Sequence, residues 1–227
     1  MVVVPVLAAL IAAGFSAALL RQFSQRGRPH QAVWGVALAM FAIAAAAEAV
    51  GAAAGWSPLL YRVYYLFGAL LNVGWLAVGS VFVLHLARTA RIATVVMAVL
   101  TLVSIVAVIT AHVDPARLHA AVPDRASSIP AVLPAVINSL ATVVLVGGAA
   151  WSAWQTHRRV SPPGMVVGLA LIAAGALIVG AAHSIAAAAG GVAILRPVSE
   201  AAGIAVMCAG YLAVEAQRGR LFSPRTI

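Results

Sequence analysis

Long apolar stretches fill most of this chain of 227 residues, and polar residues interrupt them only at intervals. The hydrocarbon core of a bilayer is about 30 Å thick, so a helix needs about 20 apolar residues to cross it. Seven stretches meet this requirement: residues 2–20, 31–54, 62–87, 92–111, 131–154, 165–189 and 197–216. The sequence therefore predicts an all-α, polytopic membrane protein, a single transmembrane domain in which seven helices form a bundle.

The composition excludes most soluble classes of protein. Charged residues make up 8% of the chain and apolar residues 64%, whereas about a quarter of a soluble domain is charged. The net charge is +9, and all 14 basic residues are arginine. Because these arginines lie between apolar stretches, we expect them to contact anionic membrane lipids and not nucleic acid. The single cysteine, Cys208, excludes an intramolecular disulfide and a cysteine-cluster metal site.

The arginines are divided unevenly between the two sides of the expected bundle. Ten follow the first, third, fifth and seventh stretches, and the other side holds Arg62, Arg117, Arg125 and Arg196. We expect the chain to lie in a bacterial cytoplasmic membrane. By the positive-inside rule, its N-terminus is then outside the cell and its C-terminus in the cytoplasm. The polar segment 113–130 becomes an external loop, which is either a lid over an outward-facing cavity or a solvated connection.

Ionisable side chains inside the expected spans are costly in a bilayer, which makes them candidates for function. At 1.5 Å per residue, Glu48 and His183 lie about 9 Å below the outer ends of their helices, and Glu200 lies about 5 Å below. We expect all three to line one pocket in the outer half of the membrane and to act as catalytic groups. The expected substrate-binding residues around them are Trp34, Phe41, Arg62, Tyr65, Asn72, Trp75, Asn138 and Arg196.

Both carboxylates also have a structural interpretation. Glu200 follows Pro197 by three residues, in the first turn of its expected helix, where a carboxylate complements the helix dipole. Glu48 lies deep in an alanine-rich helix, where it would serve as a clamp if it paired with Arg62, with Arg196 or with a tyrosine hydroxyl. The sequence leaves the functional and the structural interpretation open for each.

Two cofactor-dependent kinds of site are disfavoured. Glu48, His183 and Glu200 would come from three different helices, and the chain has no HxxxH or HExxH motif, so no metal is expected. A retinal photoreceptor needs a lysine for its Schiff base, and the chain has none. We therefore expect no cofactor.

Three of the polar candidates also have a structural interpretation. His183 would be a packing residue, and Asn72 and Asn138 would be interhelical hydrogen-bond partners.

Two resemblances add to this interpretation. Residues 55–58 (GWSP), 61–69 (YRVYYLFGA) and 75–77 (WLA) resemble a family of uncharacterised actinobacterial seven-helix membrane proteins, a likeness that implies no activity. The layout is also similar to that of membrane-bound terpene cyclases of the meroterpenoid type. Those are small seven-helix proteins with essential acids in an early helix and in the last one, and Glu48 and Glu200 occupy comparable places. This second likeness concerns architecture only, and fold does not imply function.

Three classes of function remain. The leading hypothesis is an intramembrane cyclase or isomerase-type lyase that acts on a lipophilic, isoprenoid-like substrate by general acid–base chemistry. Its rivals are a proton-coupled transporter and a receptor-like or scaffolding subunit without catalysis. The expected partners are membrane lipids, a lipophilic small molecule, and a second membrane protein or another copy of the chain.

Overall fold

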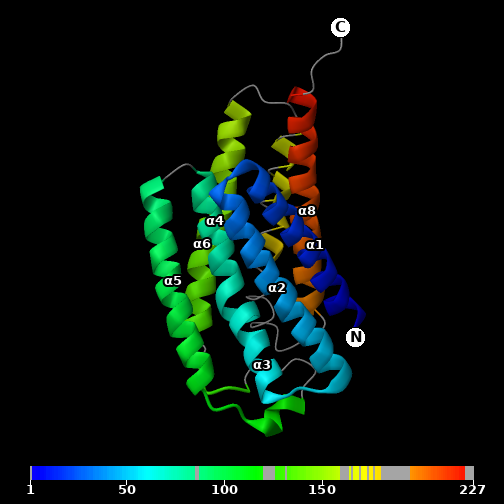
Figure 1. Ribbon diagram of the computed structural model, residues 1–227, viewed down its shortest axis with the longest axis vertical. Coiled ribbons are helices and arrows are strands. Elements are labelled where there is room, and N and C mark those ends of the chain that lie inside the picture. The colour runs from blue at the N-terminus through cyan, green and yellow to red at the C-terminus, as the bar shows by residue number, and fades with distance from the viewer. Residues whose placement is uncertain are drawn as a thin grey trace.

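The computed structural model describes residues 2–84, 87–119, 126–130, 132–158 and 195–222, together with most of 164–179. Helices make up 91% of the described residues, which confirms the all-helical fold. Five helices are long and apolar enough to cross a membrane: Val3–Arg26, Pro29–Ala54, Pro58–Val83, Arg88–Thr110 and Val132–Ser152. They run side by side in an elongated bundle (Figure 1). Helices of this length and composition are those of an integral membrane protein.

Helices α1 (Val3–Arg26) and α2 (Pro29–Ala54) form an antiparallel pair joined by a two-residue turn. Helix α1 ends at Gly27, whose φ of 63° lies in the left-handed region that glycine adopts most readily. Pro29 then begins α2, because its fixed φ suits the first turn of a helix. The two helices pack closely, and the Ser16 hydroxyl donates to the Gly35 carbonyl oxygen at 2.7 Å.

The third span is built from three consecutive segments: α3 (Pro58–Tyr64), the π-helix η1 (Tyr65–Leu71) and α4 (Asn72–Val83). Ser57 caps its beginning by accepting a hydrogen bond from the Leu60 N–H at 3.2 Å, and Pro58 is the first helical residue. The span therefore begins four residues before the expected start at residue 62, because Ser57 and Pro58 together are a helix start signal.

Helices α5 (Ala87–Thr110) and α6 (Val132–Arg158) are linked by the segment expected to be an external loop. Its described part contains the short 3-10 helix η2 (Pro115–His119) and an antiparallel bridge between Val113 and Ser127. The side chains of Val113, Leu118 and Ala126 are buried. The described part of this loop is therefore folded against the end of the bundle and is more than a solvated connection.

The helix Val166–Val179 and α8 (Leu195–Phe222) pack against each other through pairs of glycines. A Cβ added at Gly168 would lie 2.8 Å from the Gly210 carbonyl oxygen, and one at Gly175 would lie 2.5 Å from the Gly203 carbonyl oxygen. The residue numbers rise along one helix as they fall along the other, so the two helices are antiparallel. Glycine lets their backbones approach this closely.

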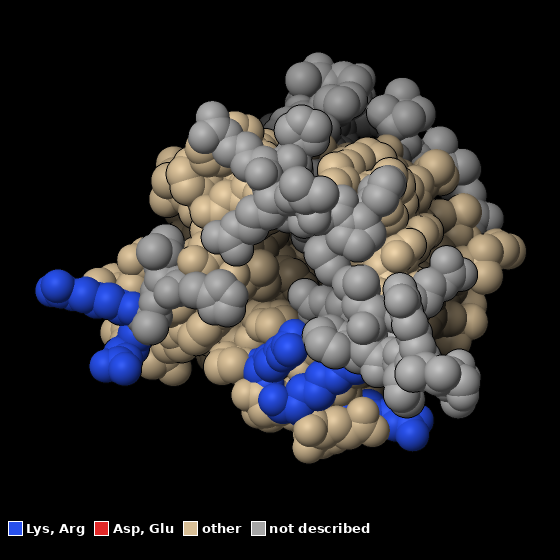
Figure 2. All heavy atoms as spheres, turned by 90° about the horizontal axis from the view of Figure 1, so that it is seen from above, with Lys and Arg blue, Asp and Glu red and all other residues tan. Residues whose placement is uncertain are grey.

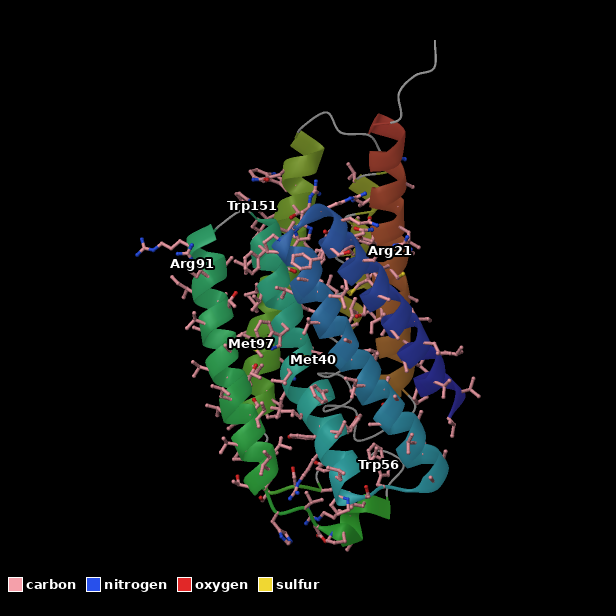
Figure 3. All side chains as sticks on the ribbon, in the orientation of Figure 1. Arg21, Met40, Trp56, Arg91, Met97 and Trp151 are labelled. Atoms are coloured by element: carbon pink, nitrogen blue, oxygen red, sulfur yellow. The ribbon has the colours of Figure 1, made fainter. Side chains whose placement is uncertain are left out.

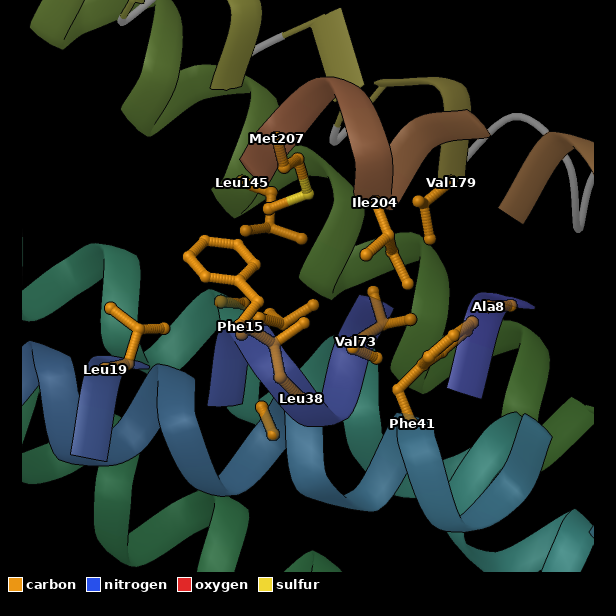
Figure 4. Close-up of a cluster of buried hydrophobic side chains, with 14 of the residues drawn as sticks. Ala8, Phe15, Leu19, Leu38, Phe41, Val73, Leu145, Val179, Ile204 and Met207 are labelled. Atoms are coloured by element: carbon orange, nitrogen blue, oxygen red, sulfur yellow. The ribbon is translucent and has the colours of Figure 1, made fainter. Parts of the chain in front are cut away.

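The main hydrophobic core lies between α1, α2, α4, α6 and α8 (Figure 4), and it includes Phe15, Leu38, Phe41, Leu145 and Met207. The two ends of the bundle differ in charge. Figure 2 views the end near the C-terminus, where arginine side chains are in view and no acidic side chain of the described part is. Arg21 and Arg91 lie toward this end and Trp56 toward the opposite end (Figure 3).

Candidate functional site

Glu48 is buried near the C-terminal end of α2, with 7% of its surface exposed. It lies one turn after Ala44. A Cβ added to Gly68 of η1 would lie 3.1 Å from the Cβ of Ala44, so α2 and η1 approach each other closely at this point. Tyr64, one turn before Gly68, is also buried and clusters with Ala44. Because α2 and the third span run antiparallel, Glu48 and Tyr64 lie at about the same level of the bundle. The structure therefore places a carboxyl group in the interior at the level of an aromatic ring.

Aromatic side chains gather at this end of the third span. The rings of Tyr61 and Tyr65 stack with their centroids 5.6 Å apart, and Trp56 meets Tyr64 edge-on at 5.2 Å. The Tyr61 hydroxyl donates to the Ser127 hydroxyl at 3.2 Å, which ties the segment between α5 and α6 to α3. Tyr65, an expected substrate-binding residue, is buried with 8% of its surface exposed. These rings give the end of the bundle near Glu48 an aromatic lining.

The π-helix η1 gives Asn72 and Asn138 a specific structural role. A π-helix has a wider turn than an α-helix, and the Asn72 N–H donates to the Phe67 carbonyl oxygen, five residues earlier. This change of pairing frees main-chain groups at the junctions. The Asn138 side-chain amide donates to the Ala69 carbonyl oxygen at 2.8 Å, and the Asn72 side-chain oxygen accepts from the Val73 N–H at 2.6 Å. Both asparagines thus satisfy the backbone of an irregular helix within the bundle.

Arg62 also holds two elements together. Its guanidinium donates to the Ala111 carbonyl oxygen at 3.1 Å, directly after the last residue of α5. A cation at the C-terminal end of a helix interacts favourably with the helix dipole. The buried Nε of Arg62 has no hydrogen-bond partner among the described residues. The contact with Ala111 supports a structural role for Arg62, while a role in substrate binding stays a prediction.

The remaining expected aromatic residues are spread along the bundle. The indole of Trp34 donates to the Leu76 carbonyl oxygen at 3.0 Å, and the indole of Trp75 donates to the Thr101 hydroxyl of α5 at 3.2 Å. Phe41 is part of the main core. Trp34 precedes Glu48 by fourteen residues on α2, which corresponds to about 21 Å along the helix axis. Trp34 and Glu48 therefore belong to opposite halves of the bundle.

Two apolar cavities flank Trp34 in the half that carries the arginines. The first is lined by residues of α1, α2, α4, the helix Val166–Val179 and α8, namely Phe15, Leu19, Trp34, Leu38, Leu76, Ile172, Met207 and Tyr211. The second extends to α6, and its lining is Trp34, Ser80, Val83, Leu145, Gly148, Ala149, Ser152, Ile172 and Met207. Their volumes are about 20 Å³ and 50 Å³. Glu48 lines neither cavity.

A cluster of polar side chains that the sequence analysis missed borders the first cavity. The Tyr211 hydroxyl contacts the Gln22 side-chain oxygen, which also accepts from the Gln31 side-chain amide at 2.8 Å. Gln31 is 1% exposed, and its own side-chain oxygen has no partner among the described residues. A sequence signal did exist, since Gln22 follows Leu19 by three residues and so continues the inward face of α1.

The other expected site residues are described only in part. Glu200 and Arg196 lie in the first turns of α8, where the structure describes the backbone and not these side chains, and His183 lies outside the described residues. Their convergence with Glu48 in one outer pocket therefore stays a prediction. Among the described residues, no group of three or more metal-ligating side chains is close enough to hold a metal ion.

Comparison of the chain with protein-family models, with curated proteins and with solved structures finds no match. The case for a function therefore depends on the geometry of the bundle and on the chemistry of its buried groups.

Proposed function

We propose that this chain is a seven-helix protein of the bacterial cytoplasmic membrane that acts on a lipophilic, isoprenoid-like molecule by proton exchange at Glu48. Two shorter apolar helices, Val166–Val179 and Ala201–Val214, accompany the five long ones, and their antiparallel glycine contacts support a count of seven. The division of the arginines supports an N-terminus outside and a C-terminus in the cytoplasm.

The buried position of Glu48 carries this proposal. An ionisable side chain within a membrane-spanning helix is expensive, and such residues commonly mark sites of proton transfer. Glu48 is 7% exposed. The residues one turn before and about one turn after it, Ala44 and Gly51, are small, and aromatic rings lie at its level. A carboxyl group in such surroundings is suited to give a proton to a substrate and later to regain one.

The chemistry requires no oxidant or reductant. In the proposed reaction, Glu48 gives its proton to an alkene or an epoxide of a folded isoprenoid, and a carbon–carbon bond forms as the π electrons of a second double bond attack the cation. Aromatic rings such as Tyr65 stabilise the cation through their π faces. Glu200 or His183 then removes a proton from a neighbouring carbon, which regenerates a double bond. The product is an isomer of the substrate.

The proposal is tested by replacing Glu48 in membranes supplied with a linear polyprenyl epoxide. Glu48→Gln keeps the size of the side chain but cannot exchange a proton, whereas Glu48→Asp keeps the carboxyl group. We expect the wild type and Glu48→Asp to form an isomer of equal mass in which a carbon ring and a hydroxyl group replace the epoxide. Glu48→Gln should lower its rate of formation by about 100-fold or more. Chromatography with mass spectrometry measures the product.

The matched control is Asp114→Asn, which removes an exposed acid that pairs with Arg117 at 3.3 Å in the external loop. This control should leave product formation unchanged. Equal rates in the wild type and in Glu48→Gln would contradict catalysis by Glu48. A large fall in the melting temperature of Glu48→Gln, with no product formed by the wild type, would indicate a structural clamp or a scaffolding subunit.

The π-helix η1 supports a second candidate, a proton-coupled carrier. Interrupted helices line the substrate sites of many transporters, and π-helical turns occur frequently at functional sites. The Asn138 side-chain oxygen beside η1 is buried without a partner among the described residues. A carrier would drive uptake of its substrate into proteoliposomes under an imposed pH gradient, and Glu48→Gln would remove the dependence on the gradient while the substrate is still bound.

A further inference from the structure

Trp56, which is not among the substrate-binding residues expected from the sequence, packs against α2 one turn beyond Glu48. It belongs to the short turn between α2 and α3 (Figure 3), where Gly55 has a φ of 90°, a conformation that glycine adopts readily. The chain folds back at this turn, so that the indole ring lies against Gly51 of α2 and meets Tyr64 edge-on. Because Gly51 has no side chain, the ring has room to lie on the helix.

The indole nitrogen of Trp56 is a neighbour of Glu48 on the surface of α2. A Cβ added at Gly51 would be nearest to Cε2 of the indole, the carbon that is bonded to Nε1. Gly51 follows Glu48 by three residues, and positions three apart on a helix are neighbours, with about 5–6 Å between their Cβ atoms. The indole N–H and the carboxyl group therefore occupy adjacent positions.

This N–H group is a donor that lacks an acceptor. The Trp56 Nε1 atom is buried and has no hydrogen-bond partner among the described residues, and a buried donor left unpaired is costly. The indoles of Trp34 and Trp75 do have acceptors, the Leu76 carbonyl oxygen and the Thr101 hydroxyl. An oxygen of a bound molecule would pair the Trp56 N–H in the same way.

The chemistry of this donor favours an uncharged oxygen. An indole N–H forms one hydrogen bond and carries no charge, whereas phosphate groups are recognised mainly through charged donors. A plain alkene has no oxygen to accept the bond. An epoxide oxygen has two lone pairs, so it can accept from the Trp56 N–H and from a protonated Glu48 together. Of the two substrates that proton exchange at Glu48 allows, an alkene or an epoxide, the unpaired N–H therefore favours the epoxide.

We propose that the substrate is the epoxide of an isoprenoid hydrocarbon and that the Trp56 N–H binds its oxygen beside Glu48. This inference rests on the proposed function, whose substrate it specifies. As the Glu48 proton moves to the oxygen, the C–O bond to the more substituted carbon breaks and its electron pair stays on the oxygen, which becomes a hydroxyl group. The cation forms on that carbon, a second double bond attacks it, and a base removes a proton from a neighbouring carbon. The Trp56 N–H holds the oxygen throughout.

The test measures binding without turnover. The probe is a tritium-labelled epoxide of a saturated isoprenoid chain, which has no double bond to close a ring, and the unlabelled parent alkane competes with it. Scintillation proximity on the purified full chain gives both affinities. The wild type should bind the epoxide about tenfold or more tightly than the alkane. Trp56→Phe, which keeps an aromatic ring without the N–H, should lower this preference about fivefold or more and change the affinity for the alkane far less.

The matched control is Trp151→Phe, which removes the N–H of an indole that is 50% exposed on α6. This control should leave the preference for the epoxide unchanged. If Trp56→Phe does not fold, benzothienylalanine at position 56 replaces it, because this residue keeps the shape of the indole and has sulfur in place of the N–H. An unchanged preference at position 56, an equal loss of affinity for both ligands, or no preference in the wild type would overturn the proposal. Tighter binding of a polyprenyl diphosphate than of the epoxide would also overturn it.

The result is distinguishable from the test of catalysis by Glu48. A preference for the epoxide that depends on Trp56, together with undiminished product formation by Glu48→Gln, would support the epoxide site and contradict proton exchange at Glu48. Loss of product in Glu48→Gln without any effect of Trp56 on binding would contradict the epoxide site alone.

Discussion

Most of the buried polar side chains described here have a partner that explains their position. Asn138 pairs with the Ala69 carbonyl oxygen, Asn72 with the Val73 N–H and Arg62 with the end of α5. The sequence analysis named these three residues as candidate substrate-binding residues. Their hydrogen-bond partners could not be predicted from the sequence, because those partners are backbone groups left free by a π-helix and by a helix end. Glu48 is also buried, at 7% exposed, within a run of small residues on α2.

At the residue scale, Asn138→Ala tests the structural role of this side chain. The variant leaves the Ala69 carbonyl oxygen of η1 without its donor, so the free energy of unfolding should fall by about 1 kcal/mol or more. The control is Ser139→Ala, the neighbouring position, which is exposed. Unfolding in a detergent titration, followed by circular dichroism, measures both variants. A fall no larger than that of the control would contradict the assignment of Asn138 to the π-helix.

At the scale of elements, the sequence predicted the helices better than their internal geometry. Apolar length and the cap signals at Gly27, Ser57 and Pro58 are local features, so they can be found without knowing the fold. In a regular α-helix, spacings of three and four residues would place Tyr61, Tyr65, Gly68, Asn72, Trp75 and Gly79 of the third span on one face. In the structure, Trp75 reaches α5 and Gly79 lies against Trp34 of α2. The π-helix widens one turn and shifts the following residues around the axis, which a periodicity of 3.6 residues cannot anticipate.

The glycine contacts between the last two helices give a prediction about one element pair. In Gly203→Val, the new Cβ would lie 2.8 Å from the Gly175 carbonyl oxygen and 2.6 Å from a methyl group of Val179, so the helices must move apart. We expect a loss of about 1–3 kcal/mol of stability, or failure to fold. Gly14→Val is the control, because an added Cβ there has nothing within 4 Å. Equal melting temperatures for the two variants in detergent would show that the close approach is not required.

At the scale of the whole molecule, the two ends of the bundle carry different features. Glu48 and the stacked tyrosines lie toward the end that carries the segment between α5 and α6, and the cavities beside Trp34 lie toward the arginine-rich end. The sequence predicted an outer pocket from the depth of its ionisable residues. It could not predict the cavities beside Trp34, because a cavity depends on how apolar side chains from several helices fill the space between them.

Both functional proposals depend on how the chain crosses the membrane, so topology is the most direct test. A cysteine-free background, Cys208→Ala, receives single cysteines at Ala116 in the external loop, at Ser24 near the end of α1 and at Ser223 near the C-terminus. Intact cells are then treated with a membrane-impermeant maleimide. We predict that the cysteine at position 116 is labelled at once, and that those at positions 24 and 223 are labelled only after the membrane is opened. Labelling of position 24 or 223 in intact cells, with position 116 protected, would contradict the account.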